Sequence, residues 1–398
     1  MGTNLPARRV CRALTCGWPG QHRCAPTVDV MVAAPPGARR HPGVVVLALA
    51  VLLGGVVVPS ASLVQALTYP GEASTTVRLV EWAREHGGGG IVDLVENWWY
   101  ARPPVVASLA PADLPAPPTA VATGSPPVLA PLVPALPGEG QWVAGASSSL
   151  GEPAIYTTFE RPDARHRGVV VGVALLESRA IVTHLIAGTR QPLPQTRADD
   201  ARVPDALQSS LVATFNSGFK MQDAHGGFYA DGHVAVPLRD GAASLVVRRD
   251  GSATVGQWGQ DAVAGPDVVA VRQNLDLVVD NGRPAPGLDG NTSQSWGTAK
   301  NQLQYTWRSG IGIDASGNLV YVAGDGMNLV TLAAALLQAG AVRGMQLDIH
   351  SEMVDFFSYR HGAGSDAPVA TKLLPTMPGR SDRYLVPDQR DFVAVTLR

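Results

Sequence analysis

Between residues 139 and 398 the chain repeats one pattern, a short apolar run rich in β-branched residues that ends at Gly, Asp or Asn. Runs of this length and with these boundaries are typical of β-strands. Two stretches, RRDGSATV and IDASGNLVYV, also contain the short Asp/Gly turns of β-hairpins. The runs are GVVVGVALL (168–176), AIVTHLI (180–186), SLVATF (210–215), SLVVRRDGSATVG (244–256), VVAVRQNLDLVVDNG (268–282), SGIGIDASGNLVYVAG (309–324), GMQLDI (344–349) and FVAVTL (392–397).

One segment of this region has helical spacing instead. From Leu329 to Leu337, leucine and alanine recur at positions i, i+3, i+4, i+7 and i+8, and Gly340 can end the helix. Residues 139–398 are numerous enough for one sizeable core. We therefore predict an α+β fold, a strand-rich mixed sheet with few helices, preceded by a membrane anchor and a Pro-rich stalk.

The chain before this domain divides by composition. Residues 103–138 predict a semi-rigid linker, because eleven of residues 103–137 are proline and few are charged. Residues 61–102 predict a short helical hairpin around the four glycines of REHGGGGIV, with Ser74 or Thr75 as its first N-cap. The WWY triplet that ends this hairpin either anchors at a membrane interface or packs within the hairpin.

Residues 42–60 contain an uncharged apolar run, and the ARRH sequence before it is basic. A basic flank followed by such a run is typical of a signal sequence or a short membrane anchor, and the length of the run leaves both open. Residues 1–41 predict a disordered cytoplasmic extension, with Met31 as an alternative start. We expect a cell-membrane protein whose main domain is extracytoplasmic, or a secreted one if the segment is cleaved.

Composition excludes several classes of function. The formal net charge is −2, so nothing favours a nucleic-acid partner. Cys11, Cys16 and Cys24 are the only cysteines, which excludes a disulfide scaffold, a cysteine nucleophile and thiolate zinc sites from the main domain. The chain has no G-x-S-x-G, Walker or dinucleotide-binding motif in a suitable setting. We expect neither a cofactor nor a metal, and the oligomeric state stays open.

Polar residues gather in the stretch FNSGFKMQDAHGGFYADG (215–232). Asn216 can donate or accept hydrogen bonds, its glycines allow close backbone approach to a ligand, and Lys220 and His225 can hold an anion. A glycine-rich hairpin loop explains the same composition equally well.

Two further stretches carry charged groups at the ends of predicted strands. Arg308, in YTWRSGIGID, is placed either as a fork for phosphate or carboxylate or as a surface arginine. Asp325, in GDGMN, lies at the entry to the predicted helix, where capping and anion binding are alternatives.

The stretch MQLDIHSEMVDF (345–356) runs from an apolar strand into polar residues. Asp348, His350 and Glu352 are spaced two apart, so in an extended chain all three would point to one face. Three ligands on one strand match no metal motif, and a catalytic strand end and a polar sheet edge remain the two interpretations.

Three blocks in this order resemble the phosphodiester glycosidase family over roughly residues 205–360. ATFNSGFKMQDAHGGFYADG is similar to the family's N-G-G-F-F block. WRSGIGIDASGNLVYVAGDG is similar to R-T-A-I-G-I-D-x-D-G-x-L-x-x-x-x-x-D-G. MNLVTLAAALLQAGAVRGMQLDIHSEM is similar to the block that ends L-D-G-G-G-S. The resemblance implies cleavage of a sugar-1-phosphodiester at the glycosidic bond, which yields a free sugar and a phosphomonoester.

The resemblance implies site residues at the matching positions, which are Asn216, Gly218, Phe219, Arg308, Gly310, Asp325, Gly326 and Asp348. The family's D-G-G-G-S is D-I-H-S-E here, so a glycine nest for phosphate is replaced. Asp348 is the first candidate for the catalytic carboxylate, and Glu352 and Asp325 are the other acids. Arg308, Lys220 and His350 would hold phosphate, and Asn216 would orient the substrate.

The sequence therefore predicts an extracytoplasmic hydrolase that acts on a carbohydrate or sugar-phosphate substrate with a GlcNAc-like sugar, in cell-envelope or extracellular glycans. The altered D-G-G-G-S block keeps an alternative open, a non-catalytic protein that binds glycan or anionic polymer. A structural or assembly role in the envelope is a third reading.

Overall fold

The computed structural model describes residues 60–68, 74–104, 110–118, 122, 126–193, 200–298, 302–361 and 368–398. They belong to one compact unit, Ser60–Arg398. The predicted extension (1–41) and all but the last residue of the predicted signal or anchor segment lie outside the described residues. Among the described helices, none is long and apolar enough to cross a bilayer.

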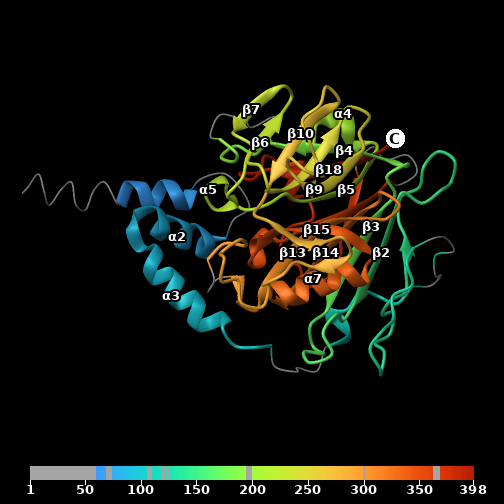
Figure 1. Cartoon of the computed structure of the whole chain (residues 1–398), viewed down its shortest axis with the longest axis horizontal. Coiled ribbons are helices and arrows are strands. Elements are labelled where there is room, and N and C mark those ends of the chain that lie inside the picture. Colours follow the sequence, from blue (N-terminus) through green and yellow to red (C-terminus); the bar gives the residue numbers. More distant parts are fainter. Residues whose placement is uncertain are drawn as a thin grey trace, which may run out of the picture. The chain divides into compact units, whose positions relative to one another are not determined.

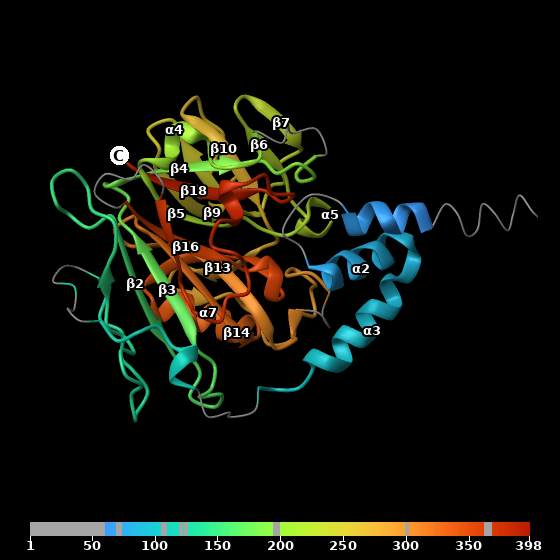
Figure 2. The same ribbon diagram turned by 180° about the vertical axis from the view of Figure 1, so that it is seen from behind.

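Three β-sheets form the body of this unit (Figures 1 and 2). The eight-stranded sheet has the order β1 (Val143–Ala144), β2 (Ile155–Glu160), β3 (Val171–Leu176), β14 (Leu319–Met327), β13 (Thr306–Asp314), β15 (Ala341–Ile349), β11 (Leu277–Asp280) and β12 (Arg283–Pro284). One five-stranded sheet has the order β7 (His233–Val236), β6 (Phe228–Ala230), β10 (Val268–Gln273), β8 (Ala243–Arg248) and β9 (Ala253–Gln257). The other has the order β17 (Pro368–Lys372), β16 (Phe356–His361), β5 (Leu211–Asn216), β18 (Phe392–Leu397) and β4 (Ile181–Ile186).

Helices are few in the part of the chain that the structure describes, so the prediction of a strand-rich α+β fold is confirmed. The prediction of a mixed sheet is wrong, since every pairing of neighbouring strands in the three sheets is antiparallel as far as the structure describes them. The physical reason is the position of β13. The strand–helix–strand segment β14–α7–β15 does run in one direction, but β13 lies between the two strands and pairs antiparallel with both.

Aromatic side chains fill the space between the eight-stranded sheet and the sheet that contains β5. Phe215 of β5, Tyr321 of β14 and Phe356 of β16 are fully buried, with ring centroids 4.8–5.8 Å apart. Burying three such rings removes a large apolar area from water and fixes the two sheets face to face. The polar ends of these strands are thereby brought to a common edge.

The helix α7 (Leu329–Gln338) covers the opposite face of the eight-stranded sheet (Figure 1). Asn328 caps its first turn by accepting a hydrogen bond from the Thr331 N–H at 2.9 Å. Gly340, with φ +93°, follows its last turn, as predicted. A Cβ at Gly310 of β13 would lie 3.1 Å from a Leu332 methyl, so this glycine lets the helix approach the sheet closely.

The N-terminal helices precede the sheets. Residues 60–68 are helical, α2 spans Thr75–Ala83, and α3 spans Gly89–Tyr100. Ser74 is the N-cap of α2, as predicted. The chain bends in the π-helical turn Arg84–Gly88, where Gly87 has φ +85°. Neither α2 nor α3 has a buried residue, so this pair contributes little to the core.

The remaining helical pieces are short. α4 spans Asp205–Gln208 and α5 spans Met221–Ala224. Single 3₁₀ turns span Pro111–Asp113, Ser351–Met353 and Arg383–Leu385. The turn at Ser351–Met353 comes directly after β15 and bears on the site described next.

Candidate active site

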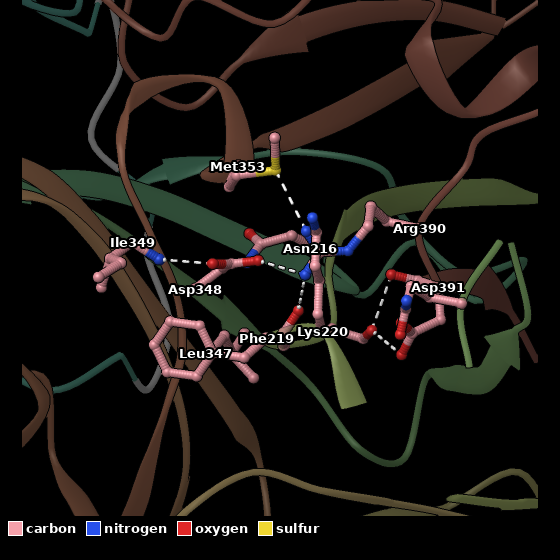
Figure 3. A network of polar contacts seen from close by, with 12 residues as sticks. Asn216, Phe219, Lys220, Leu347, Asp348, Ile349, Met353, Arg390 and Asp391 are labelled. Carbon is pink, nitrogen blue, oxygen red and sulfur yellow. Dashed lines mark hydrogen bonds and ion pairs between the residues drawn. The ribbon is translucent and has the colours of Figure 1, made fainter. Parts of the chain in front are cut away.

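The buried carboxyl group of Asp348 lies at the centre of the candidate site, near the end of β15 (Figure 3). One carboxylate oxygen, Oδ1, accepts a hydrogen bond from the Ile349 N–H at 2.8 Å, and Oδ2 accepts one from Arg390 Nη2 at 2.9 Å. The Asp348 side chain is 7% exposed. The carboxyl group therefore has a fixed orientation and little contact with bulk water.

Arg390 connects Asp348 to two other elements. Its Nη2 also donates to the Gly218 carbonyl at 2.8 Å, and its Nη1 lies 3.4 Å from the Met353 sulfur (Figure 3). Its Nε is buried and has no hydrogen-bond partner among the described residues. A buried guanidinium N–H without an acceptor is costly unless a ligand or water satisfies it.

Burial raises the pKa of the Asp348 carboxyl to about 6, although the Arg390 charge and the Ile349 N–H both oppose the shift. The group is then half-ionised near pH 6 and ionised at neutral pH. A carboxyl group that titrates close to the working pH can accept a proton from water or stabilise positive charge on a sugar ring.

A cavity of about 280 Å³ has Arg390 in its wall. Met353 and Arg390, both in contact with the Asp348 region, form part of its wall. Four cationic side chains line this cavity, which we call the cationic cavity: Arg190, Lys220, Arg383 and Arg390. Three acids also line it: Glu81, Glu85 and Asp388. Such a lining suits an anionic ligand group.

Asn216, at the end of β5, supports Asp348 from behind. Its Nδ2 donates to Ser309 Oγ at 2.9 Å, and that hydroxyl oxygen accepts the Asp348 N–H at 3.2 Å. Its Oδ1 accepts from the Tyr321 hydroxyl at 3.0 Å and from the Asp355 N–H at 3.3 Å. These contacts join four strands, β5, β13, β14 and β15, at the point where Asp348 lies, and they use both ends of the Asn216 amide.

The other predicted residues of the stretch 215–232 differ in their surroundings. The Gly218 carbonyl holds the Arg390 guanidinium, and the next residue, Phe219, is buried and donates its N–H to Asn274 at 3.2 Å. The Lys220 ammonium lines the cationic cavity. His225 is exposed, with φ +48° at the end of α5, and does not line the cavity.

Arg308 is fully buried in β13, and its guanidinium is surrounded by protein acceptors. Nε donates to the Met327 carbonyl at 2.8 Å, Nη1 to the side-chain oxygens of Gln302 and Gln346 at 3.0 Å, and Nη2 to the carbonyls of Gln302 and Gln304 at 2.9 Å. Burial lowers the pKa of Arg308 to about 9, so the group stays charged at neutral pH. Arg308 thus lies in the interior of the domain and is not a surface arginine.

Two more predicted positions lie at the end of β14. Asp325 accepts the Gly326 N–H at 2.7 Å, and its carboxyl pKa is raised by burial. The cap of α7 is Asn328 and not Asp325. Gly326 has φ +69°, a conformation that favours glycine, and Pro104 packs beside it.

The prediction that Asp348, His350 and Glu352 share one face is wrong, because β15 ends at Ile349. His350 has φ +73°, and a 3₁₀ turn follows it. The change of backbone direction turns His350 and Glu352 toward the N-terminal helices. The His350 ring lies 5.5 Å from that of Tyr100, and Glu352 Oε2 accepts the Ser74 N–H at 2.8 Å.

The environment of His350 disfavours protonation of its imidazole. Burial lowers the pKa of its imidazole to about 4, and the nearby charge of Arg308 acts in the same direction. The ring is therefore neutral at pH 7, although Glu96 Oε2 lies 3.9 Å from Nε2. Its Nδ1 lies 3.4 Å from the Thr306 hydroxyl.

Sequence reasoning missed the residues contributed by the chain around PDQRDF (387–392). Besides Arg390, this stretch supplies Asp391, which pairs with buried Arg272 at 2.6 Å, and Asp388, which pairs with Arg383 at 2.7 Å. The available signal was a cluster of charged residues directly before an apolar strand, FVAVTL. Within the described residues no group of three or more His, Cys, Asp or Glu side chains is placed to hold a metal ion.

Comparison with protein families identifies the domain that carries this site. Residues 209–373 match the family described as phosphodiester glycosidase. This span, under half of the chain, is therefore similar to phosphodiester glycosidase domains, and the predicted resemblance to that family is confirmed there. Asp348, Asn216 and Lys220 lie within the matched span, whereas Arg390 lies beyond its end.

Solved structures resemble the chain at low identity. The catalytic domain of zebrafish N-acetylglucosamine-1-phosphodiester alpha-N-acetylglucosaminidase, described as auto-inhibited by its pro-peptide, is 16% identical, with a TM-score of 0.42, over 65% of this chain and 88% of that one. A hypothetical protein from Synechocystis is 14% identical, with a TM-score of 0.36, over 62% of each chain. A putative exported protein from Burkholderia pseudomallei is 13% identical, with a TM-score of 0.33, over 57% of this chain and 74% of that one. A search of curated proteins finds no match.

Proposed function

We propose that the domain hydrolyses the glycosidic bond of a sugar-1-phosphodiester with a GlcNAc-like sugar. The observation that carries this proposal is the buried Asp348 carboxyl, held by Arg390 at the wall of the cationic cavity. In a phosphodiester glycosidase domain, this arrangement supplies both groups that the reaction needs, a carboxylate for the sugar and cations for the phosphate.

The chemistry follows from the leaving group. The bond between the anomeric carbon and the phosphate oxygen breaks, and the phosphomonoester leaves with the electron pair. Because a phosphate is a good leaving group, strong general-acid help is unnecessary. Water adds to the anomeric carbon, and Asp348 accepts its proton while its negative charge stabilises the oxocarbenium-like transition state.

We give different roles to the other residues in this proposal. Lys220 and Arg390 bind the phosphate, and Asn216 holds the backbone at Asp348 through Ser309. The remaining predicted residues are not part of this proposal, because they lie in the interior, on the surface or against the N-terminal helices. They are Arg308, Gly310, His225, Asp325, Gly326, His350 and Glu352.

Replacing one acid and comparing it with a matched acid tests this proposal. In the full chain, Asp348→Asn should lower kcat on an α-N-acetylglucosamine 1-phosphodiester by roughly 10³-fold, since the amide cannot accept the proton. Asp325→Asn, an acid at the end of a neighbouring strand, should stay within about twofold of wild type. Free sugar and phosphomonoester are measured separately. Full turnover by Asp348→Asn would refute the assignment.

The alternative is binding without turnover to a glycan or anionic polymer. It is favoured by the replacement of the glycine block D-G-G-G-S with D-I-H-S-E and by the position of Asp348, which is not among the residues that line the cavity. Saturable binding of a teichoic-acid-like polymer, with no product from any phosphodiester offered, would support this second function.

We also propose that residues 42–60 attach the chain to a membrane, with the domain outside the cytoplasm, unless they are cleaved as a signal. The support is the apolar run after a basic flank and the exposed apolar face of α3, formed by Ile91, Leu94, Val95 and Trp98. The full chain should float with lipid vesicles, and a variant without residues 43–58 should not. Mass spectrometry of the mature protein distinguishes an anchor from a cleaved signal.

A further inference from the structure

The cationic cavity has walls from two distant parts of the sequence. The domain supplies its four cations and Asp388, whereas Glu81 of α2 and Glu85 of the following turn come from the N-terminal helices. The two glutamates therefore face a mainly cationic surface of the domain.

Glu81 makes a direct ion pair with this surface. Its Oε1 lies 2.8 Å from Lys220 Nζ, and the two side chains are 23% and 21% exposed. Among the described residues, Glu81 is the acid that lies within ion-pair distance of Lys220. Lys220 lines the same cavity as Arg390, whose buried Nε has no acceptor in the part of the chain that the structure describes. A carboxylate of this chain thus occupies a position suited to the anionic group of a ligand.

Polar contacts hold the N-terminal helices in this place. The Ser74 N–H donates to Glu352 at 2.8 Å, the Gln304 amide donates to Asn97 at 2.9 Å, and the Tyr305 N–H donates to the Tyr100 carbonyl at 3.0 Å. Neither α2 nor α3 has a buried residue, so the two helices are not part of the core. Contacts of this kind contribute little each, so an anionic ligand can compete with them.

We propose that Lys220 and Arg390 form the phosphate subsite of the domain and that Glu81 is its internal occupant, which an anionic ligand must displace. The nature of the ligand rests on the proposed function, but the competition itself does not require turnover. Glu352 contributes to this arrangement, because it accepts the Ser74 N–H and so holds the first turn of α2 against the domain.

Phosphate binding to the full chain tests the proposal without any assay of catalysis. Inorganic phosphate is titrated calorimetrically at constant ionic strength into wild type, Glu81→Gln, Glu85→Gln and Lys220→Met. Glu81→Gln should bind phosphate roughly three- to tenfold more tightly, because a partly exposed ion pair of that strength no longer competes. Glu85→Gln is the matched control and should stay within about twofold of wild type. Lys220→Met should lose most of the affinity.

Each result decides one point. Unchanged or weaker binding by Glu81→Gln, or an equal gain in Glu85→Gln, overturns the internal-occupant proposal. Full phosphate affinity in Lys220→Met overturns the subsite. If phosphate binds as expected while no phosphodiester is hydrolysed, the subsite stands and the proposed hydrolase activity fails. Circular dichroism of each variant confirms that the helices and sheets are retained.

Discussion

Two arginines of this domain differ in what surrounds their guanidinium groups. Arg308 is fully buried in a central strand, and its nitrogens donate to carbonyl and glutamine oxygens. Arg390 lies in the loop before β18, with 13% of its side chain exposed, and pairs with an acid while its Nε has no acceptor among the described residues. The Arg308 guanidinium donates its hydrogen bonds to groups of the domain itself. The Arg390 guanidinium has an N–H beside a cavity that can still donate a hydrogen bond.

This difference separates a structural role from a ligand-binding one. A buried charge that is surrounded by dipoles contributes to the fold, and removing it leaves several acceptors unpaired at once. A charge at a cavity wall, with an acid on one side and a free donor, can reorganise when a ligand arrives. The place of Arg308 in a glycine-rich strand of the motif predicted phosphate binding. The acceptors around its guanidinium in the folded chain are a better guide to its role.

The largest expected effect is on the stability of the domain. Arg308→Met should lower the free energy of unfolding by roughly 3–5 kcal/mol, because buried acceptors from three chain segments lose their donor. Arg390→Met should lower it by less, roughly 1–3 kcal/mol, because its guanidinium lines a cavity and the Asp348 carboxyl, whose pKa is already raised, can take up a proton when its partner is lost. Urea unfolding followed by tryptophan fluorescence measures both. Equal losses of stability would remove the distinction between the two arginines.

The next largest effect is on catalysis, where the loss should come from the Arg390 variant. Arg390→Met should lower kcat for the phosphodiester roughly 10- to 100-fold, because the carboxylate loses its orienting partner and the phosphate loses a cation. Arg390→Lys, which keeps the charge without the planar fork, should recover part of this loss. Arg190→Met is the control, because Arg190 lines the same cavity but is not among the groups that set the pKa of Asp348. A loss as large in the control would assign the effect to the general charge of the cavity.

Much of the fold was predictable from periodicity. Each of the eight apolar runs overlaps at least one strand, and the helix at Leu329–Gln338 begins and ends within one residue of its prediction. The strands β1, β2, β6, β7, β12, β16 and β17 were missed because they are short or rich in polar and aromatic residues, as in FFSYRH of β16. Strand order was not predictable either, since the placement of β13 between β14 and β15 is decided by long-range pairing.

The candidate site was predictable only in part. The position of Asp348 at the end of a strand followed from the motif, and Lys220 followed from its block. The partner of Asp348 did not, because Arg390 lies 42 positions away in the sequence and beyond the family match. The role of His350 and Glu352 was missed for a local reason. The backbone at His350 adopts φ +73°, which the sequence IHS does not announce, and the strand pattern stops there.

The smallest expected effect, and the most specific, is on the pH profile. As pH falls through the Asp348 pKa of about 6, the carboxylate is protonated and kcat/KM should fall with it. The Arg390 charge lowers this pKa, so its removal makes protonation easier and should move the acidic limb of the Arg390→Met profile upward by about 0.5–1 pH unit. Arg390→Lys keeps a cation and should leave the limb within about 0.3 unit of wild type. Arg308 is not among the groups that set the pKa of Asp348, so Arg308→Lys should leave the limb in place as well. A limb that stays unmoved in Arg390→Met, or moves downward, would mean that a group other than Asp348 controls the acidic side of the profile.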